Sequence, residues 1–333
     1  MKKYFDVLKK FKNKRILVIG DFILDEYLYG ETERISREAP VLILKYTNSV
    51  YLAGGGANPV MNIKDLGAVP IPISIVGPDS YSEILLKILY DKKIDTSNIL
   101  IDNNFVLPIK TRIMAGSVHT VKQQIVRVDR YYENVNLEKR SDEIISRIDS
   151  MLKIADGILV SDYDGGLINK KIINHINQIA KKGMIVVVDS RYSLKFFRNI
   201  TTGTPNETEA GPIVGIEKYD EKNIEIICKK LKKILKSKGM MVTRGSKGMI
   251  VYEKNKLYKI EPYGSDEIVD VSGAGDTVAS IVTLALSCGL DIKDAAFLAN
   301  IGGGLVVLKR GVATVTQEEL KRALKNVKNK KKN

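Results

Sequence analysis

The chain has 333 residues, of which 44% are hydrophobic, and its formal net charge is +14. This length can bury a full hydrophobic core, and no apolar run approaches the roughly 18 residues that a membrane span needs. The lysines are spread over most of the predicted helices without interleaved aromatic residues, so we expect neither a nucleic-acid partner nor membrane association. The excess positive charge favours small anionic ligands instead.

The sequence also indicates a reducing compartment. Cys228 and Cys288 are the two cysteines; they are far apart and each lies within an apolar helical pattern, which is typical of buried free thiols. The lysine-rich start of the chain leads into a short apolar segment at 16–19 that ends at Gly20 and Asp21, a pattern that predicts a buried strand and not a secretion signal. We therefore expect a cytoplasmic protein.

Short apolar segments alternate with helical patterns along most of the chain. The predicted strands are residues 16–19, 71–76, 157–160, 184–188 and 240–243, and the predicted helices include 142–154, 169–181, 220–237 and 316–327. Apolar strands separated by crossover helices are typical of a parallel sheet that is covered on both faces. We therefore expect an α/β fold with a doubly wound, mostly parallel sheet and helices on both faces.

Two regions depart from this alternation of apolar strands and helices. Apolar and polar residues alternate in residues 41–46, 107–114 and 120–129, which is typical of antiparallel strands with one solvated face. We expect these strands, inserted at about 33–48 and 105–130, to form a small β-sheet lid over a ligand. The exposed face and edges of such a sheet favour pairing with a second copy of the chain.

The most informative segment is residues 270–276, Asp-Val-Ser-Gly-Ala-Gly-Asp. It follows a strand-like segment at 267–271 and precedes an apolar helical pattern at 277–287, so the amides of Gly273, Ala274 and Gly275 are predicted to open a helix and bind an anion. Asp276 beside such a site can accept a proton from an alcohol. The pattern predicts phosphoryl transfer from a nucleotide to a hydroxyl group, although a turn with a helix cap would need the same residues.

Four segments in the same order resemble signatures of the ribokinase, or phosphofructokinase-B, family of carbohydrate kinases. They are Gly-Gly-Gly-Ala-Asn at 54–58, Asn-Glu-Thr-Glu at 206–209, Thr-Arg-Gly-Ser-Lys-Gly at 243–248, and the 270–276 segment, where Ser272 replaces the usual threonine. The resemblance covers essentially the whole chain. It implies one ribokinase-like domain over residues 1–328, followed by a basic tail at 329–333.

The resemblance also implies a set of binding residues. The sugar is expected at Asp21, Asp25, Gly55, Gly56, Asn58 and Asp270. ATP is expected at Asn206, Thr243, Arg244, Gly245, Gly248, Ser272, Gly273, Gly275 and Asn300. Magnesium is expected at Asn206 and Glu209, because Mg²⁺ keeps several waters and needs few protein ligands.

Two further segments narrow the resemblance. Gly-Asp-Phe-Ile-Leu-Asp at 20–25 and Arg-Ile-Ser-Arg-Glu-Ala-Pro at 34–40 are similar to the opening of the bacterial heptose-7-phosphate kinases, and residues 122–129 and 161–163 are similar to later segments of them. This implies phosphorylation of the anomeric hydroxyl of D-glycero-D-manno-heptose 7-phosphate, for ADP-heptose and lipopolysaccharide synthesis. Those kinases are often fused to an adenylyltransferase, and we expect the kinase alone here.

Arg34, Lys122 and Arg127 are predicted to bind the 7-phosphate, with surface salt bridges as the alternative.

Several alternatives remain at this point. One is a kinase of the same fold that acts on another sugar, sugar phosphate or nucleoside. A nicotinamide-dependent dehydrogenase is disfavoured because no G-x-G-x-x-G follows the strand at 16–19. A catalytically inactive binding protein is disfavoured because Asp276, Asn206 and Glu209 are all present. Resemblance to ribokinase-type enzymes, many of which pair through their lids, implies a homodimer.

Overall fold

The computed structural model describes residues 1–117, 120–131, 137–216, 223–264 and 268–330. Its central sheet has six strands in the order β10-β9-β8-β1-β4-β5, and every pairing in it is parallel. The strands are β1 (Arg15–Gly20), β4 (Val69–Val76), β5 (Ile99–Ile101), β8 (Gly157–Asp162), β9 (Val186–Ser190) and β10 (Thr202–Gly203). β8 is buried along its whole length because both faces of the sheet are covered.

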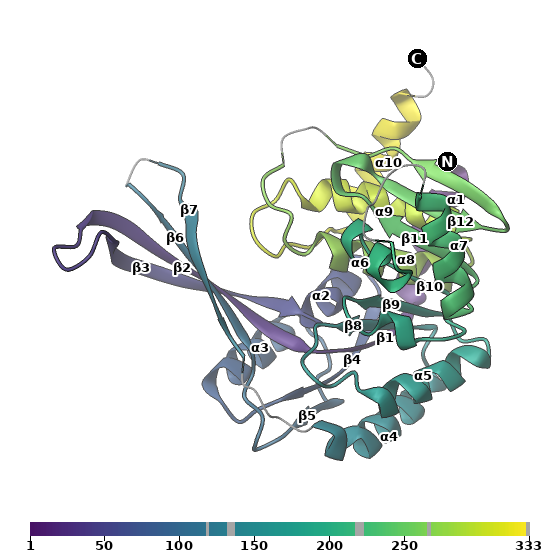
Figure 1. The fold of residues 1–333 in the computed structure, drawn as a ribbon, viewed down its shortest axis with the longest axis horizontal. Helices are drawn as coiled ribbons and strands as arrows, with labels where there is room; N and C mark the ends of the chain where they lie inside the picture. Colours follow the sequence, from purple (N-terminus) through teal and green to yellow (C-terminus); the bar gives the residue numbers. More distant parts are fainter. Residues whose placement is uncertain (118–119, 132–136, 217–222, 265–267, 331–333) are drawn as a thin grey trace.

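Helices cover both faces of this sheet, which confirms the doubly wound fold (Figure 1). On one face lie α4 (Ser141–Leu152) and α5 (Lys170–Lys181), and on the other lie α2 (Ala57–Asp65) and α8 (Ala274–Ser287). α8 packs against β8, β9, α2 and α9 (Ile292–Val306), so its apolar residues are buried on all sides. The remaining helices are α1 (Lys2–Lys10), α3 (Ser80–Asp91), α6 (Glu207–Ile213), α7 (Ile224–Leu235) and α10 (Gln317–Lys330).

The strand predicted at 240–243 exists, but its assignment to the parallel sheet was wrong. It forms β11 (Gly239–Thr243), which pairs antiparallel with β12 (Met249–Glu253), and β12 pairs antiparallel with β13 (Lys256–Ile260). The five residues between β11 and β12 are too few for a parallel crossover, so a hairpin results. A single parallel bridge between Asn206 and Thr243 links β11 to the segment after β10.

A four-stranded sheet, which we call the lid sheet, projects from the main body (Figure 1). Its order is β3-β2-β6-β7, formed by β2 (Phe22–Ile35), β3 (Leu42–Gly55), β6 (Ile109–Gly116) and β7 (Gln123–Arg130). The three strands predicted from the alternation pair antiparallel, β3 with β2 and β6 with β7, whereas β2 and β6 run parallel to each other. β2 and β3 each begin or end in the core and are exposed farther out, so the lid sheet is continuous with the main body.

The backbone before α8 also differs from the prediction. Residues 268–271 form no strand, and residue 267 lies outside the described residues. The amides of Val269 and Asp270 both donate to the carbonyl of Val307, at 2.9 and 3.1 Å, so this segment is held against the end of α9. α8 begins at Ala274, among the residues whose amides were predicted to open the helix.

Two expectations from composition can be compared with the structure. Cys228 and Cys288 are both free thiols. In the ranges that the structure describes, the helices are too short or too polar to cross a bilayer.

Candidate active site

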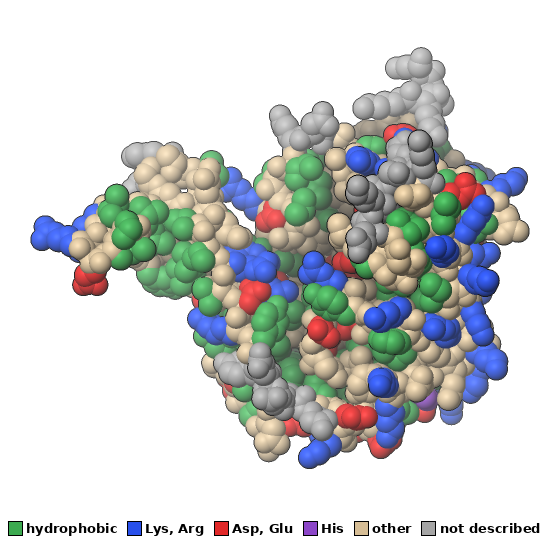
Figure 2. Space-filling model, viewed as in Figure 1, with side chains coloured by type: hydrophobic (Ala, Val, Ile, Leu, Met, Phe, Trp, Pro, Cys, Tyr) green, Lys and Arg blue, Asp and Glu red, His purple; other side chains and the backbone are tan. Residues whose placement is uncertain are grey.

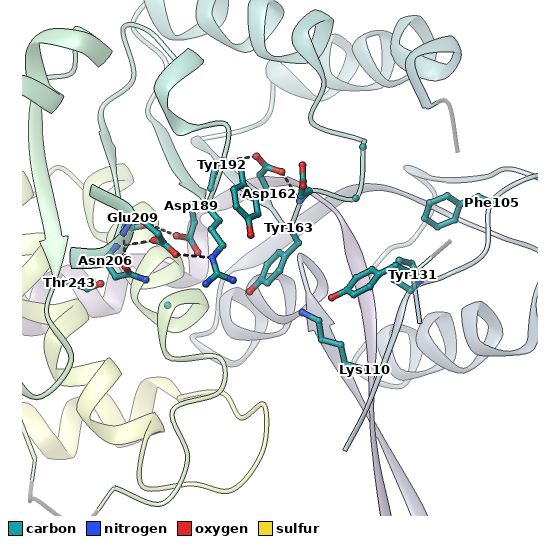
Figure 3. Close-up of a pocket in the computed structure, with 18 of the residues that line it drawn as sticks. Phe105, Lys110, Tyr131, Asp162, Tyr163, Asp189, Tyr192, Asn206, Glu209 and Thr243 are labelled. Atoms are coloured by element: carbon teal, nitrogen blue, oxygen red, sulfur yellow. Dashed lines mark hydrogen bonds and ion pairs between the residues drawn. The ribbon is translucent and has the colours of Figure 1, made fainter. Parts of the chain in front are cut away.

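A cavity of about 700 Å³ lies where the lid sheet meets the carboxyl ends of β8, β9 and β10 (Figure 3). In open parallel sheets this edge is where ligands bind, and the volume suits a small molecule. The wall on the lid side is formed by Phe105, Val106, Pro108, Lys110 and Tyr131. The remainder is formed by residues 162–166 and 189–192 with Thr204, Asn206, Glu209, Thr243 and Gly275.

Asp276 lies in the first turn of α8, next to Gly275 of the cavity wall. Its side chain is buried, and its carboxylate accepts hydrogen bonds from Asn58 Nδ2 to Oδ2 at 2.8 Å and from the Tyr163 hydroxyl to Oδ1 at 2.9 Å. Burial raises the pKa of Asp276 to about 7, although both hydrogen bonds lower it. A carboxylate with this pKa can act as a general base near neutral pH.

The start of α8 offers backbone donors beside this carboxylate. Gly273 precedes the helix with a φ of 77°, and a Cβ there would lie 2.6 Å from Asn58 Nδ2, so only glycine fits. The amide of Ala274 donates to the carbonyl of Val271, which removes it from the predicted set of anion donors. Among the described residues, the amides of Gly275 and Asp276 have no backbone acceptor, so they remain for an anion.

A buried chain of hydrogen bonds between α2 and α8 orients Asn58. The Thr277 hydroxyl donates to Asn62 Oδ1 at 2.9 Å, and Asn62 Nδ2 donates to Asn58 Oδ1 at 3.1 Å. The Asn58 Nδ2 is therefore directed at Asp276. Asn58, which was predicted to contact the sugar, donates to the predicted base and is not among the residues that line the cavity.

The glycine run at 54–56 makes room for neighbouring acidic residues. A Cβ on Gly54 would lie 1.8 Å from Asp25 Oδ2, and a Cβ on Gly55, whose φ is 50°, would lie 2.7 Å from the carbonyl oxygen of Asp21. Gly56 donates its amide to that same carbonyl at 2.7 Å. Gly55 and Gly56, both predicted at the sugar, thus let β3 and the start of α2 pack against the end of β1.

Asp21 and Asp25 have protein partners in the structure. Asp21 accepts the amides of Tyr163 at 2.9 Å and Leu167 at 3.1 Å, and burial, followed by the charge of Asp162, raises its pKa to about 7. Asp25 forms a buried ion pair with Arg112, although burial still raises its pKa. Asp21 therefore anchors a loop of the cavity wall, and Asp25 stabilises the base of the lid sheet.

None of the three cations predicted to bind the substrate phosphate is among the residues that line the cavity. Arg34 is exposed near the outer end of β2, Lys122 donates to the carbonyl of Gly116 at 3.0 Å, and Arg127 pairs with Asp129 at 2.8 Å. The cations that do line the cavity are Lys110 on β6 and Arg191 after β9, and neither was predicted. Lys110 and Arg112 are two residues apart on β6, so their side chains lie on the same face of the lid sheet.

Asn206 and Glu209, the predicted magnesium residues, both line the cavity but also cap α6. Asn206 Oδ1 accepts the Glu209 amide and Glu209 Oε2 accepts the Asn206 amide, each at 3.0 Å. Glu209 Oε1 points toward Arg191 at 3.9 Å and remains for a ligand. Within the described residues no group of three His, Cys, Asp or Glu side chains is arranged to hold a metal. The oxygen donors present suit Mg²⁺ held partly through water.

The residues predicted to bind ATP lie in three regions: between β10 and the turn after β11, at the start of α8, and within α9. Thr243 lines the cavity, and Gly245 and Gly248 have φ values of 53° and 76° in the turn that follows. Three more have protein contacts: Arg244 Nε with Glu207 at 2.7 Å, the Ser272 amide with Asp270 Oδ1 at 2.9 Å, and Asn300 Nδ2 with the Glu261 carbonyl at 2.8 Å. Asp270, which was predicted at the sugar, also accepts the Gly311 amide through Oδ2 at 3.0 Å.

Tyr163 and Asp189 were not among the predicted site residues. Asp189 accepts the Thr204 hydroxyl at 2.9 Å, and a Cβ on Gly275 would lie 3.8 Å from its Oδ2. Burial and then the charge of Asp276 raise the pKa of Asp189 to about 7. Both residues stand at the carboxyl end of a predicted apolar strand, and that position is the signal that could have identified them.

Comparisons with known proteins agree with this geometry. The family model of pfkB family carbohydrate kinases matches residues 13–319. The chain belongs to this family. It is therefore a carbohydrate kinase, which removes the dehydrogenase alternative.

Curated relatives of this pfkB-family kinase are named bifunctional protein HldE. The one from Desulfatibacillum aliphaticivorans is 33% identical over 97% of this chain and 65% of its own length. The one from Nitratiruptor sp. is 35% identical over 92% of this chain and 64% of its own length. The chain thus spans slightly less than two thirds of the length of these relatives.

Solved structures show that the kinase has the ribokinase-like fold. The Arabidopsis thaliana ribokinase, complexed with ribose and ATP, is 18% identical with a TM-score of 0.70, covering 94% of this chain and 98% of that one. The Escherichia coli phosphofructokinase-2, in complex with fructose-6-phosphate, is 18% identical with a TM-score of 0.73, covering 93% and 97%.

The buried charge of Asp189 should reduce the stability of the kinase. Because its folded pKa is raised from 3.8 to about 7, the cost is fully present above about pH 7 and disappears below about pH 4. Asp189→Asn should raise the free energy of unfolding by on the order of 1–3 kcal/mol at about pH 8 and leave it nearly unchanged at about pH 4. Urea denaturation at both pH values measures this, with Asp142→Asn, an exposed carboxylate on α4, as the control. An equal effect of Asp189→Asn at both pH values would contradict the raised pKa of Asp189.

Proposed function

We propose that the protein transfers the γ-phosphoryl group of ATP to the anomeric hydroxyl of D-glycero-D-manno-heptose 7-phosphate. The product would be the 1,7-bisphosphate, for ADP-heptose and lipopolysaccharide core synthesis in the cytoplasm. The observation that carries the transfer reaction is Asp276, buried at the start of α8 beside unpaired amides and next to the cavity wall. The proposed substrate rests on the similarity of residues 20–25 and 34–40 to heptose-7-phosphate kinases.

In the proposed reaction, the residues of the site have separate tasks. Asp276 accepts the proton of the acceptor hydroxyl. The hydroxyl oxygen then bonds to the γ-phosphorus, and the bond from that phosphorus to the ADP oxygen breaks. The amides of Gly275 and Asp276 stabilise charge on the transferred group. Lys110 and Arg191 provide positive charge in the cavity, which favours a phosphorylated acceptor. Mg²⁺, held by Asn206 and Glu209, would neutralise the phosphates of ATP.

A substrate panel tests the proposed acceptor. ADP release should be measured with heptose 7-phosphate, the same heptose without its phosphate, fructose 6-phosphate, ribose and adenosine. Heptose 7-phosphate should give the highest kcat/KM. A higher value for an unphosphorylated sugar or a nucleoside would reject the heptose assignment in favour of another kinase of this family.

Asp276→Asn should lower kcat by about 10²- to 10⁴-fold, because a general base is lost. An amide can keep both contacts, with its oxygen toward Asn58 and its nitrogen toward the Tyr163 oxygen, so nucleotide affinity should stay close to that of the wild type. Steady-state kinetics and nucleotide titration measure the two effects. Near-normal kcat would remove Asp276 from the role of base.

Glu209→Gln should raise the magnesium concentration for half-maximal rate by about tenfold, because an anionic ligand is lost. Glutamine can still accept the Asn206 amide, so the α6 cap is retained. Glu225→Gln, on the exposed face of α7, is the control. An unchanged magnesium dependence would count against the Asn206 and Glu209 assignment.

The lid sheet should mediate a homodimer. Its exposed apolar side chains gather on the projecting sheet (Figure 2), and β3 and β7 are its unpaired edges. These side chains are Ile35, Val41, Leu42, Tyr46, Val50, Val121, Ile125, Val126 and Val128. Ile125→Lys should shift the protein from dimer to monomer in light scattering, whereas Ile226→Lys on α7, at a similar exposure, should not. A fully active wild-type monomer at micromolar concentration would contradict this.

A further inference from the structure

Tyr163 contacts the predicted base from the side of the cavity. The two carboxylate oxygens of Asp276 have different partners: Oδ2 accepts from Asn58 of α2, and Oδ1 accepts from Tyr163, which lines the cavity. Oδ1 is therefore the oxygen that a residue of the cavity wall holds. A carboxylate oxygen has two lone pairs, so it can keep the phenol as a donor and still accept a proton from a sugar hydroxyl.

Tyr163 is itself fixed in place. Its amide donates to Asp21 Oδ2 at 2.9 Å, and the other oxygen of Asp21 accepts the Leu167 amide at 3.1 Å, so one carboxylate ties down both ends of the loop. The ammonium group of Lys110 lies 5.1 Å from the centre of the Tyr163 ring, and Figure 3 shows Lys110 pointing toward that ring. The phenol is thus held by its backbone and by its ring.

We propose that Tyr163 is a positioning residue of the kinase reaction, which holds the Asp276 carboxylate in its productive orientation, and that Asp21 acts through Tyr163. The proposal rests on the proposed role of Asp276 as the base. It also assigns Asp21 a task other than the sugar contact that the sequence predicts. Because the phenol donates to the ionised carboxylate, removal of the phenol hydroxyl should make Asp276 easier to protonate.

The acid limb of the pH–rate profile reports this effect. The hydrogen bond from Tyr163 lowers the pKa of Asp276, so Tyr163→Phe should move the acid limb of kcat upward by about one pH unit and lower kcat about tenfold at neutral pH. The other groups that face Asp276 are unchanged in this variant: Asn58 from α2, Asp25 from β2, Lys110 from β6 and Asp189 from β9. The KM for the acceptor should change little.

Tyr4→Phe is a matched control. The Tyr4 hydroxyl donates to Asp294 Oδ1 at 2.9 Å, the same geometry as at Tyr163 but between α1 and α9. It should leave the acid limb where it is in the wild type. An unshifted acid limb in Tyr163→Phe, or an equal shift in Tyr4→Phe, would overturn the proposal.

Two combined variants test whether the effects pass through Asp276 and Tyr163. In an Asp276→Asn background, Tyr163→Phe should cause no further loss of rate; the same tenfold loss in both backgrounds would overturn the proposal. Asp21→Asn should shift the acid limb in the same direction, and its effect should not add to that of Tyr163→Phe. Fully additive effects would show that Asp21 acts elsewhere. The profiles use whichever acceptor the substrate panel ranks first, so that rejection of heptose 7-phosphate stays separate from rejection of this role for Tyr163.

Discussion

The burial of one carboxylate, Asp276 at the start of α8, is the constraint on which the rest of the site depends. To hold that charge, the structure brings an amide from α2 to one oxygen and a phenol from the loop after β8 to the other. Asn58 is oriented by Asn62 and Thr277, and the loop is anchored by a second buried carboxylate, Asp21. Among the described residues, the Gly275 and Asp276 amides at the helix start have no backbone acceptor, so this turn offers anion donors beside the Asp276 carboxylate.

This arrangement reduces stability. Asp21, Asp189 and Asp276 all have pKa values raised to about 7, and in each case burial is the largest cause. Three such groups at one edge of the sheet are unfavourable for a folded protein near neutral pH, and they are typical of a site selected for chemistry. The positively charged Lys110 and Arg191 line the same cavity as Asp189, so charges of both signs meet there.

The sequence predicted the elements of the fold well and their contacts less well. Apolar segments identified β1, β4, β8 and β9, because strands buried on both faces leave a clear pattern. The strand β2 was missed because residues near its outer end, from Thr32 to Arg34, are exposed and polar. The 270–276 motif includes Gly275, which lines the cavity, but no spacing reveals that Asn58 contacts Asp276, or that Asn206 and Glu209 also cap a helix. Tyr163 and Asp189 join the site only because parallel pairing of β1, β8 and β9 aligns the ends of those strands.

The central claim is that burial makes Asp276 a base that ionises near neutral pH. Carbon-13 NMR of protein labelled at the aspartate carboxyl carbon, with Asp276→Asn to assign the resonance, measures this pKa directly. We predict a titration midpoint near 7 for the free protein, well above that of an exposed carboxylate. A midpoint below about 5, close to the usual range of aspartate, would contradict the account.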